Sequence, residues 1–200
     1  MRVTSGSAKG THLRAPGAGV RPTSDRVKEA LFNALAPRLA DARVLDLFAG
    51  TGALGIEALS RGAARSVFIE RDPRMVAAIR RNLAAAHVDD RAEARRGSVP
   101  AALDAIEREG AAFDLIVLDP PYGQELPART LRRLADSPLL APGGIIAADG
   151  HWRDDPGEIP GLRRVRDARY GETGLWFYVR QEPADPAGGP AKIEEGGDAE

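Results

Sequence analysis

The stretch VLDLFAGTGALG, residues 44–55, runs from a hydrophobic strand through a glycine-rich turn into a helix. The apolar run predicts a buried strand over 43–48, and the residues after the turn predict a helix over 53–61. Gly50 and Gly52 let the backbone turn tightly and let a ligand approach the N-terminus of that helix. A strand that enters a helix in this way predicts an α/β fold with a mostly parallel sheet.

The rest of the sequence repeats the alternation of strand and helix. Further strands are predicted over 65–70, 92–96, 113–118 and 144–149, and helices over 73–86, 100–109, 127–136 and after the capping residues 23–25. Two last strands, 162–170 and 173–180, flank Gly171-Glu172, which predicts a hairpin and an antiparallel edge. We therefore expect a doubly wound, mostly parallel Rossmann-like sheet with helices on both faces.

The composition divides the chain into three regions. Residues 1–22 carry Gly, Ser and Pro with short polar–apolar alternation, which predicts a β-hairpin or an arm. Residues 23–180 contain the alternating strands and helices without any repeat, which predicts one domain. Residues 181–200 are rich in Pro, Gly, Ala and acids, which predicts a disordered acidic tail.

A second informative stretch, Asp119-Pro120-Pro121-Tyr122, follows the predicted strand 113–118. The two prolines cannot continue that strand, so the chain leaves the sheet at its carboxyl end, where open α/β sheets bind ligands. Asp119 and the Pro120 carbonyl can accept the two N–H groups of an exocyclic amino group, while Tyr122 stacks on the base. A plain Pro-Pro turn with a surface tyrosine is the alternative interpretation.

The ligand of the glycine-rich turn has two interpretations. Gly50-Thr51-Gly52-Ala53-Leu54-Gly55 matches the G-x-G-x-x-G pattern of dinucleotide-binding proteins. Asp46, however, would repel a pyrophosphate and attract the amino group and sulfonium of S-adenosylmethionine. Glu70 ends the next strand, where an acid can hold the ribose hydroxyls of either ligand. Asp46 and the Asp119 turn therefore favour S-adenosylmethionine, with S-adenosylhomocysteine as the product, over a nicotinamide.

The composition excludes several kinds of chemistry. The chain has 200 residues and no cysteine, so it has no thiol for a covalent pyrimidine adduct or for cysteine-ligated zinc. Its three histidines, His12, His87 and His151, have no metal-ligand spacing. No apolar stretch approaches the roughly 20 residues that cross a bilayer, and the absence of cysteine fits a cytoplasmic protein.

Charge is distributed unevenly along the chain. Because the whole chain carries −1 and residues 181–200 carry −5, residues 1–180 carry +4. Residues 1–28 alone carry +5, and Arg163, Arg164, Arg166 and Arg169 form a second basic group. Basic stretches of this kind fit a phosphate backbone, although an ordinary solvated surface is the alternative.

With these residues in place, the chain resembles the S-adenosylmethionine-dependent amino-methyltransferases, and more closely the RsmD-type enzymes that modify guanine N2 in bacterial 16S ribosomal RNA. The resemblance covers residues 1 to about 180. It depends on RPTSDR at 21–26, the stretch 44–55 with the following EALSRGA, LDPPY at 118–122 and YGET at 170–173. The sequence departs from the family pattern at Gly97-Ser98, where such enzymes often have Gly-Asp. A serine hydroxyl can still form a hydrogen bond with the adenine amino group, but a weaker one than a carboxylate forms.

The resemblance implies a seven-stranded fold, cytoplasmic action during small-subunit maturation, no metal and no membrane contact. Together with the residue patterns it assigns catalysis to Asp119, Pro120 and Tyr122. It assigns cofactor binding to Thr23, Arg26, Asp46, Phe48, Gly50, Gly52, Glu70, Arg71, Gly97, Ser98 and Asp119. RNA and target contacts fall on Arg2, Lys9, Arg14, Arg21, Tyr122, Tyr170 and Thr173. We expect a monomer that acts on 16S rRNA within a small-subunit assembly particle.

Alternative functions remain open from the sequence. The same turn serves DNA adenine or cytosine amino-methylation, and a related one serves protein glutamine methylation. No added target-recognition domain is visible in 200 residues, which weighs against a sequence-specific DNA enzyme. A non-catalytic RNA-binding assembly factor is a further alternative. Helix capping by Thr23 and a simple hairpin role for Tyr170 and Thr173 are the structural alternatives at those positions.

Overall fold

The computed structural model describes residues 1–16, 25–121 and 125–181. Its helices are α1 (Asp25–Leu35), α2 (Ala53–Ser60), α3 (Pro73–Ala85), α4 (Val99–Arg108) and α5 (Leu126–Ala135), with short 3-10 turns at Ala36–Arg38, Asp89–Arg91 and Trp152–Asp154. Its strands are β1 (Arg43–Leu47), β2 (Arg65–Glu70), β3 (Ala92–Arg96), β4 (Phe113–Leu118), β5 (Leu140–His151), β6 (Leu162–Tyr170) and β7 (Thr173–Arg180). These bounds confirm the predicted elements to within a few residues.

Within the described residues, seven strands form one sheet in the order β3-β2-β1-β4-β5-β7-β6. Strands β1 to β5 pair in parallel, whereas β7 is antiparallel to both β5 and β6. The strand order reverses between β1 and β4, which is the position where doubly wound sheets bind their ligands. The predicted parallel sheet with an antiparallel C-terminal hairpin is therefore confirmed.

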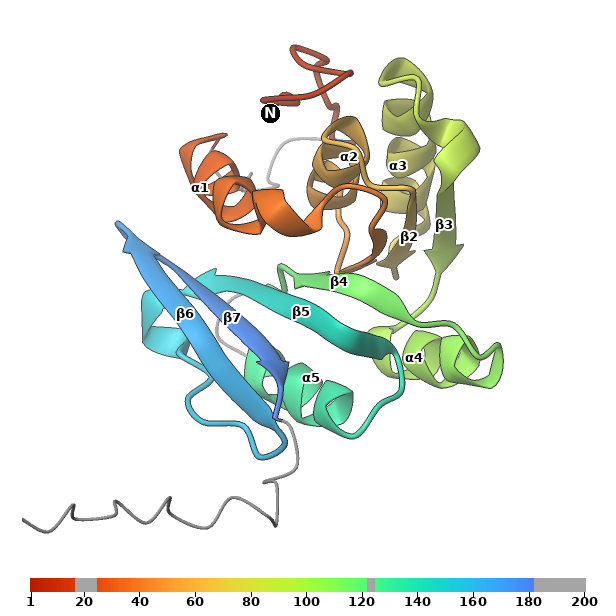
Figure 1. The fold of residues 1–200 in the computed structure, drawn as a ribbon. Coiled ribbons are helices and arrows are strands. Elements are labelled where there is room, and N and C mark those ends of the chain that lie inside the picture. The colour runs from red at the N-terminus through yellow and green to blue at the C-terminus, as the bar shows by residue number, and fades with distance from the viewer. Residues whose placement is uncertain (17–24, 122–124, 182–200) are drawn as a thin grey trace, which may run out of the picture.

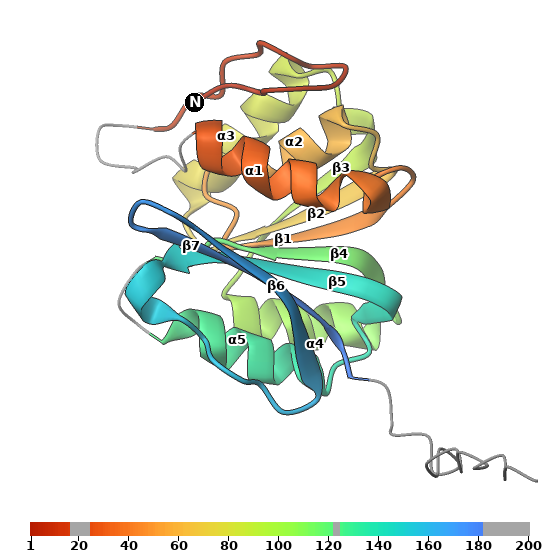
Figure 2. The same cartoon turned by 60° about the vertical axis from the view of Figure 1, so that its left-hand side comes forward.

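Helices cover both faces of the sheet (Figures 1 and 2). On one face α1, α2 and α3 enclose a core that includes Phe32, Ile56 and Phe68, each fully buried. On the other face α4 and α5 enclose a second core around Leu103 and Leu131. Side chains of the inner strands alternate between these cores, so each inner strand is apolar on both sides.

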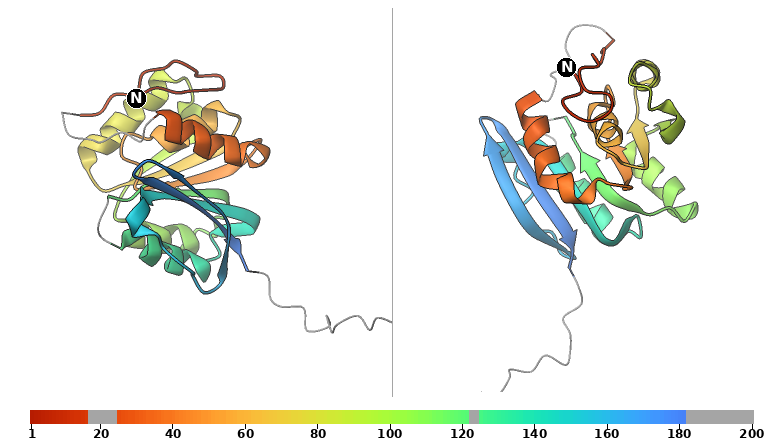
Figure 3. Two further views of the ribbon diagram at one scale, coloured as in Figure 1. Left: turned by 90° about the vertical axis from the view of Figure 1, so that its left-hand side faces the viewer. Right: turned by 45° about the horizontal axis from the view of Figure 1, so that its top comes forward.

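Residues 1–16 form an arm that lies over α2 and α3 (Figure 3). The predicted hairpin is reduced to one antiparallel bridge, Arg2 to His12. The backbone N–H groups of Thr4 and Ser5 donate to the Glu57 carboxylate of α2, and the N–H of Ser7 donates to the Ser60 carbonyl. Because these groups bond to α2, they are not available for a strand ladder.

One predicted boundary differs. The strand expected over 144–149 begins at Leu140, and the segment 141–144 is accommodated as an irregularity. Phe113 pairs with Leu140 but Leu115 pairs with Ile145, so four residues of β5 lie opposite one residue of β4. Gly143 has φ of 73°, which permits this local turn within the strand.

Several predictions lie outside the described residues. These are the roles of Arg21, Thr23 and Tyr122 and the disordered acidic tail, of which only Gln181 is described.

Candidate active site

Acidic residues gather where the central parallel strands end. Asp46 lies near the end of β1, Glu70 ends β2, and Asp119 follows β4 directly. Leu47 pairs with Leu118 on one side and Ile69 on the other, so these ends are level across the sheet. The Asp119 N–H donates to the Leu47 carbonyl at 3.5 Å, which keeps the turn after β4 beside β1.

The glycine-rich turn after β1 has a left-handed backbone that is strained at Phe48. Phe48, Gly50 and Gly52 have φ of 62°, 55° and 80°, and Phe48 is a non-glycine residue in this region. Such strain persists only where the surroundings enforce it, and it concentrates at ligand sites. A Cβ on Gly55 would lie 2.3 Å from the Phe68 ring, so α2 packs directly against β2 through this glycine.

Two acidic side chains hold this turn in place. Asp46 Oδ2 accepts the N–H of Gly55 at 2.9 Å, beneath the turn. Glu70 accepts the N–H groups of Gly50 and Asp72, both at 2.8 Å. Glu70 therefore already fixes the turn, and further lone pairs of its carboxylate can accept ribose hydroxyls.

Asp46 has an unusual environment for an acid. Its side chain is buried, and burial, together with the charges of Asp119 and Glu70, raises its pKa to about 8 although the Gly55 bond opposes this. A buried carboxyl of this kind has a strong electrostatic preference for a cationic ligand. A cationic ligand beside this carboxyl would favour its ionised form, whereas a pyrophosphate would disfavour it.

We expect this carboxyl to make unfolding pH-dependent when no ligand is present. The unfolded chain releases the Asp46 proton near pH 3.8, whereas the folded chain keeps it to about pH 8. The folded state therefore binds the extra proton, and its stability falls as pH rises through that window, by up to about 1.4 kcal/mol per pH unit. Urea unfolding at about pH 5 and pH 7.5 should show a smaller fall for Asp46→Asn than for the wild type. Equal falls would contradict the buried, protonated state.

The structure brings most of the predicted cofactor residues together. Asp46, Phe48, Gly50, Gly52 and Glu70 form the turn and its supports, and the Gly97 N–H donates to the Glu70 carbonyl at 2.9 Å. Arg71 and Ser98 are exposed at the same edge. Ser98 precedes α4 without a side-chain cap bond, so its hydroxyl is not used in capping the helix. Arg26 is exposed in the first turn of α1. These ligand contacts themselves stay predictions.

The arm reaches the same edge of the sheet through Asn82 of α3. Asn82 accepts the Arg14 N–H at 2.9 Å and donates to the carbonyls of Arg14 and Thr51 at 3.1 and 2.9 Å. Arg14 is thus connected through one side chain to the glycine-rich turn. Arg2, Lys9 and Arg14 have exposed side chains, as a contact with RNA requires.

One residue of the basic N-terminal stretch has a different role. The Lys28 ammonium lies 2.9 Å from the Glu57 carboxylate, and both side chains are completely buried. It also donates to the Arg2 carbonyl. Lys28 therefore belongs to the protein interior and adds no charge to the surface. No sequence signal could have indicated this, because a buried and an exposed lysine look alike in the chain.

The β6–β7 hairpin ends at this edge too. Tyr170 pairs with Thr173, which pairs in turn with His151 at the end of β5. Beside them, Arg169 and Arg153 lie over the Trp152 ring with their guanidinium carbons 3.8 and 5.2 Å from its centre. The predicted target residues Tyr170 and Thr173 thus lie at the carboxyl edge of the sheet.

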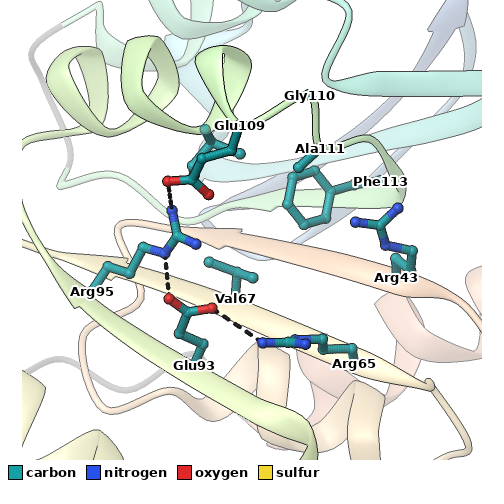
Figure 4. A pocket seen from close by; sticks show the side chains of 10 residues that line it. Arg43, Arg65, Val67, Glu93, Arg95, Glu109, Gly110, Ala111 and Phe113 are labelled. Atoms are coloured by element: carbon teal, nitrogen blue, oxygen red, sulfur yellow. Dashed lines mark hydrogen bonds and ion pairs between the residues drawn. The ribbon is translucent and has the colours of Figure 1, made fainter.

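A cavity of about 230 Å³ lies at the opposite edge, near the starts of β1, β2 and β4 (Figure 4). Arg65, Glu93, Arg95 and Glu109 form a ladder of ion pairs across it, with distances of 3.3, 2.7 and 2.8 Å. Neighbouring acids already neutralise these arginines, and the ladder connects β2 and β3 to the residue that follows α4. We assign no ligand to it.

Two negative findings concern the described residues alone. None of their helices is both long and apolar enough to cross a membrane. In the same residues, His, Asp and Glu side chains form no group of three that could hold a metal ion.

The sheet order, the strained glycine-rich turn and the acidic edge define a Rossmann-like α/β protein of the methyltransferase class. The family model described as "Conserved hypothetical protein 95" matches residues 1–179. Ribosomal RNA small subunit methyltransferase D of Escherichia coli is 36% identical over 185 residues, which is 90% of each chain. The chain belongs to this family, the RsmD-type methyltransferases.

Solved structures agree with the fold. A hypothetical protein from Thermus thermophilus has a TM-score of 0.76 and 31% identity, and the match covers 88% of this chain and 98% of that one. An RNA methyltransferase from Salinibacter ruber, solved with S-adenosyl-L-homocysteine, has a TM-score of 0.64 and 24% identity over 82% and 97% of the two chains. The latter likeness concerns the fold alone.

Proposed function

We propose that this protein transfers a methyl group from S-adenosylmethionine to the N2 amino group of a guanine in 16S ribosomal RNA. The observation that carries the proposal is membership of a family whose model matches residues 1–179. A similar protein, 36% identical, is named as a ribosomal RNA small subunit methyltransferase. The Asp119 turn supports it, because it lies beside the glycine-rich turn at the same end of the sheet.

The residues around the glycine-rich turn fit the cofactor. The buried carboxyl of Asp46 suits its positive charge, the Glu70 carboxylate suits the ribose hydroxyls, and Ser98 is available for the adenine amino group. A Cβ at Gly52 would lie 3.3 Å from the side chains of Ile56, Ile79 and Phe68. A larger residue at this position would therefore disturb the glycine-rich turn. When bound, S-adenosylmethionine supplies an electrophilic methyl group on a cationic sulfur.

The protein's own contribution is to orient and activate the amino group. A guanine N2 nitrogen is a poor nucleophile because its lone pair is delocalised into the ring. Accepting its two N–H bonds at Asp119 and at the Pro120 carbonyl favours a pyramidal nitrogen and directs the lone pair toward the methyl carbon. The nitrogen loses one proton on methylation, and Asp119 or water can accept it. Stacking by Tyr122 completes the proposal, although this residue lies outside the described ranges.

Removing the buried carboxyl should weaken cofactor binding. We expect Asp46→Ala to lower the affinity for S-adenosylmethionine about tenfold, a loss of about 1.4 kcal/mol, because the ligand's positive charge loses the buried carboxyl group that can ionise to face it. Isothermal titration calorimetry measures this directly. Asp114→Ala, which removes an exposed acid at the opposite end of β4, is the matched control and should bind as the wild type does. Unchanged affinity in Asp46→Ala would reject the placement of the cofactor over this residue.

Contacts with the RNA backbone are proposed for the arm. Arg2, Lys9 and Arg14 are exposed there, so reversing the charge of Lys9 and Arg14 should weaken RNA binding and lower its salt dependence by about one unit of slope per phosphate contact. Fluorescence anisotropy over a salt series measures both quantities. The same reversal at Arg108, which is exposed at the end of α4, is the control. An unchanged salt slope in the arm variant would remove the arm from the interface.

The wider setting follows from the same proposal. We infer that the protein is a cytoplasmic monomer that meets its RNA within a small-subunit assembly particle. Residues 1–22 would form the RNA-contacting arm and 23–180 the methyltransferase domain, while the acidic residues after Gln181 lie outside the described part of the chain.

The experiment that tests the function offers tritiated S-adenosylmethionine to unmodified small subunits, protein-free 16S RNA, duplex DNA and a protein extract in parallel. The product is digested to nucleosides and identified by mass. We expect N2-methylguanosine from ribosomal RNA. Label in DNA or protein would overturn the substrate, and bound cofactor without any label would favour a non-catalytic assembly factor.

A further inference from the structure

A buried carboxyl group beside the proposed catalytic turn has no role so far. Asp149 lies near the end of β5 and is 2% exposed. Its Oδ2 atom has no hydrogen-bond partner among the residues that the structure describes. A buried carboxyl oxygen without a hydrogen bond costs folding free energy, and a bound ligand that donates to it would remove this cost.

Asp149 is at the same level as Asp119. The last pair of the parallel β4–β5 ladder joins Leu118 to Ala148, so the next residues on each chain are Asp119 and Asp149. Val117 and Ala147 face the core under α1, α2 and α3, while Leu118 and Ala148 face the other, so strand alternation directs both acids toward the first face. Burial and the charge of Asp119 together raise the pKa of Asp149 well above its usual range, as expected for two adjacent carboxyl groups.

The sheet order places the two acids relative to the cofactor turn. Asp46 and Glu70 lie on β1 and β2, on one side of β4, whereas β5 and Asp149 lie on the other. A target base held by Asp119 therefore has the cofactor residues on one side and Asp149 on the other. The neighbourhood of Asp149 is closely packed: its strand partner is Leu175, and a Cβ on adjacent Gly174 would lie 2.4 Å from the Trp176 ring.

Guanine presents a hydrogen-bonding edge that matches two adjacent carboxyl groups. Its N2 amino group stands next to the ring N1–H, so two donors lie side by side. The amino groups of adenine and cytosine have an unprotonated ring nitrogen in that position. A carboxyl group can accept N1–H through one oxygen even when the other oxygen carries a proton directed toward Asp119.

We propose that Asp149 is a specificity-determining residue that accepts the N1–H of the target guanine while Asp119 accepts its N2–H. This inference rests on the function proposed above. It makes the chemistry selective for guanine at the point of transfer, independently of how the RNA is recognised elsewhere.

The test compares two target bases that share the amino group. The methylated guanosine is first located by mass, and 16S RNA is then ligated with either guanine or 2-aminopurine at that position. 2-Aminopurine keeps the amino group but has an unprotonated N1. We expect the wild type to prefer guanine about 10- to 100-fold in single-turnover rate, the usual effect of leaving a buried acceptor unpaired. Equal rates on the two bases would overturn the inference without any variant.

Two variants separate recognition from a structural role. Asp149→Asn can donate to the unprotonated N1, and Asp149→Leu can bond to neither base, so both should reduce the preference to near unity. Cofactor affinity should stay unchanged. A role in folding alone would lower both rates by the same factor and keep the wild-type preference, which would overturn the inference. Asp167→Asn on exposed β6 is the matched control.

Failure of this inference is distinguishable from failure of the function. If the wild type methylates guanine but does not discriminate against 2-aminopurine, the proposed function is supported and the proposed role of Asp149 is wrong. If the wild type methylates no guanine, both are wrong.

Discussion

Replacing Asp119 by alanine is expected to lower methyl transfer by about 10³-fold or more, with little change in cofactor affinity. The loss combines two effects, because the amino group loses the acceptor that orients it and the product loses a nearby proton acceptor. The location of Asp119 explains why the transfer rate should change while the cofactor affinity does not. It follows β4 and its N–H bonds to the end of β1, whereas the acids that hold the glycine-rich turn are Asp46 and Glu70.

Single-turnover rates with saturating cofactor measure the chemical step, and calorimetry measures the cofactor affinity separately. Asp119→Asn is the informative companion, since its amide oxygen can accept an N–H but cannot take a proton. Its rate should fall between those of the wild type and Asp119→Ala, with an altered pH profile. The control is again Asp114→Ala at the far end of the same strand. Turnover like that of the wild type in Asp119→Ala would remove this residue from the mechanism.

The second large effect is expected at Glu57, which connects the arm to the domain. Its carboxylate accepts from the Thr4 N–H and hydroxyl at 2.9 and 2.7 Å and from Arg61 at 2.8 Å. It also pairs with the buried Lys28. Burial alone would raise the pKa of Glu57, but these donors outweigh it and hold the pKa below its usual value.

Glu57→Ala should therefore cost about 3–5 kcal/mol in the free energy of unfolding, because it leaves the Lys28 ammonium buried without its counter-ion. Urea unfolding measures the loss, and limited trypsin digestion should show faster cleavage after Lys9 and Arg14 as the arm detaches. Glu29→Ala removes an exposed acid from α1 and is the control, with an expected change within about 0.5 kcal/mol. A loss as small as that of the control would show that the buried pair does not hold the arm.

Much of the fold could be predicted because its signals are local. An apolar run ends at Glu70 and another at Leu118, and both strands have the predicted bounds. The segment 140–144 could not be predicted correctly, since pairing Phe113 with Leu140 depends on a neighbouring strand and not on local propensity. The arm differs from a hairpin for a similar reason, because Glu57 of a distant helix takes its N–H groups.

The sequence by itself determined the α/β class, the glycine-rich turn and the acids at the strand ends. Each of these depends on residues that are adjacent in the chain, where proline, glycine and apolar runs constrain the backbone directly. Only the tertiary structure decided which acidic side chains are buried and which charged groups they contact. It buried Asp46 and placed Asp149 level with Asp119. It also enclosed Lys28 together with Glu57. Burial and pairing arise when segments distant in sequence pack together, and it is this packing that sets the charge state of a side chain.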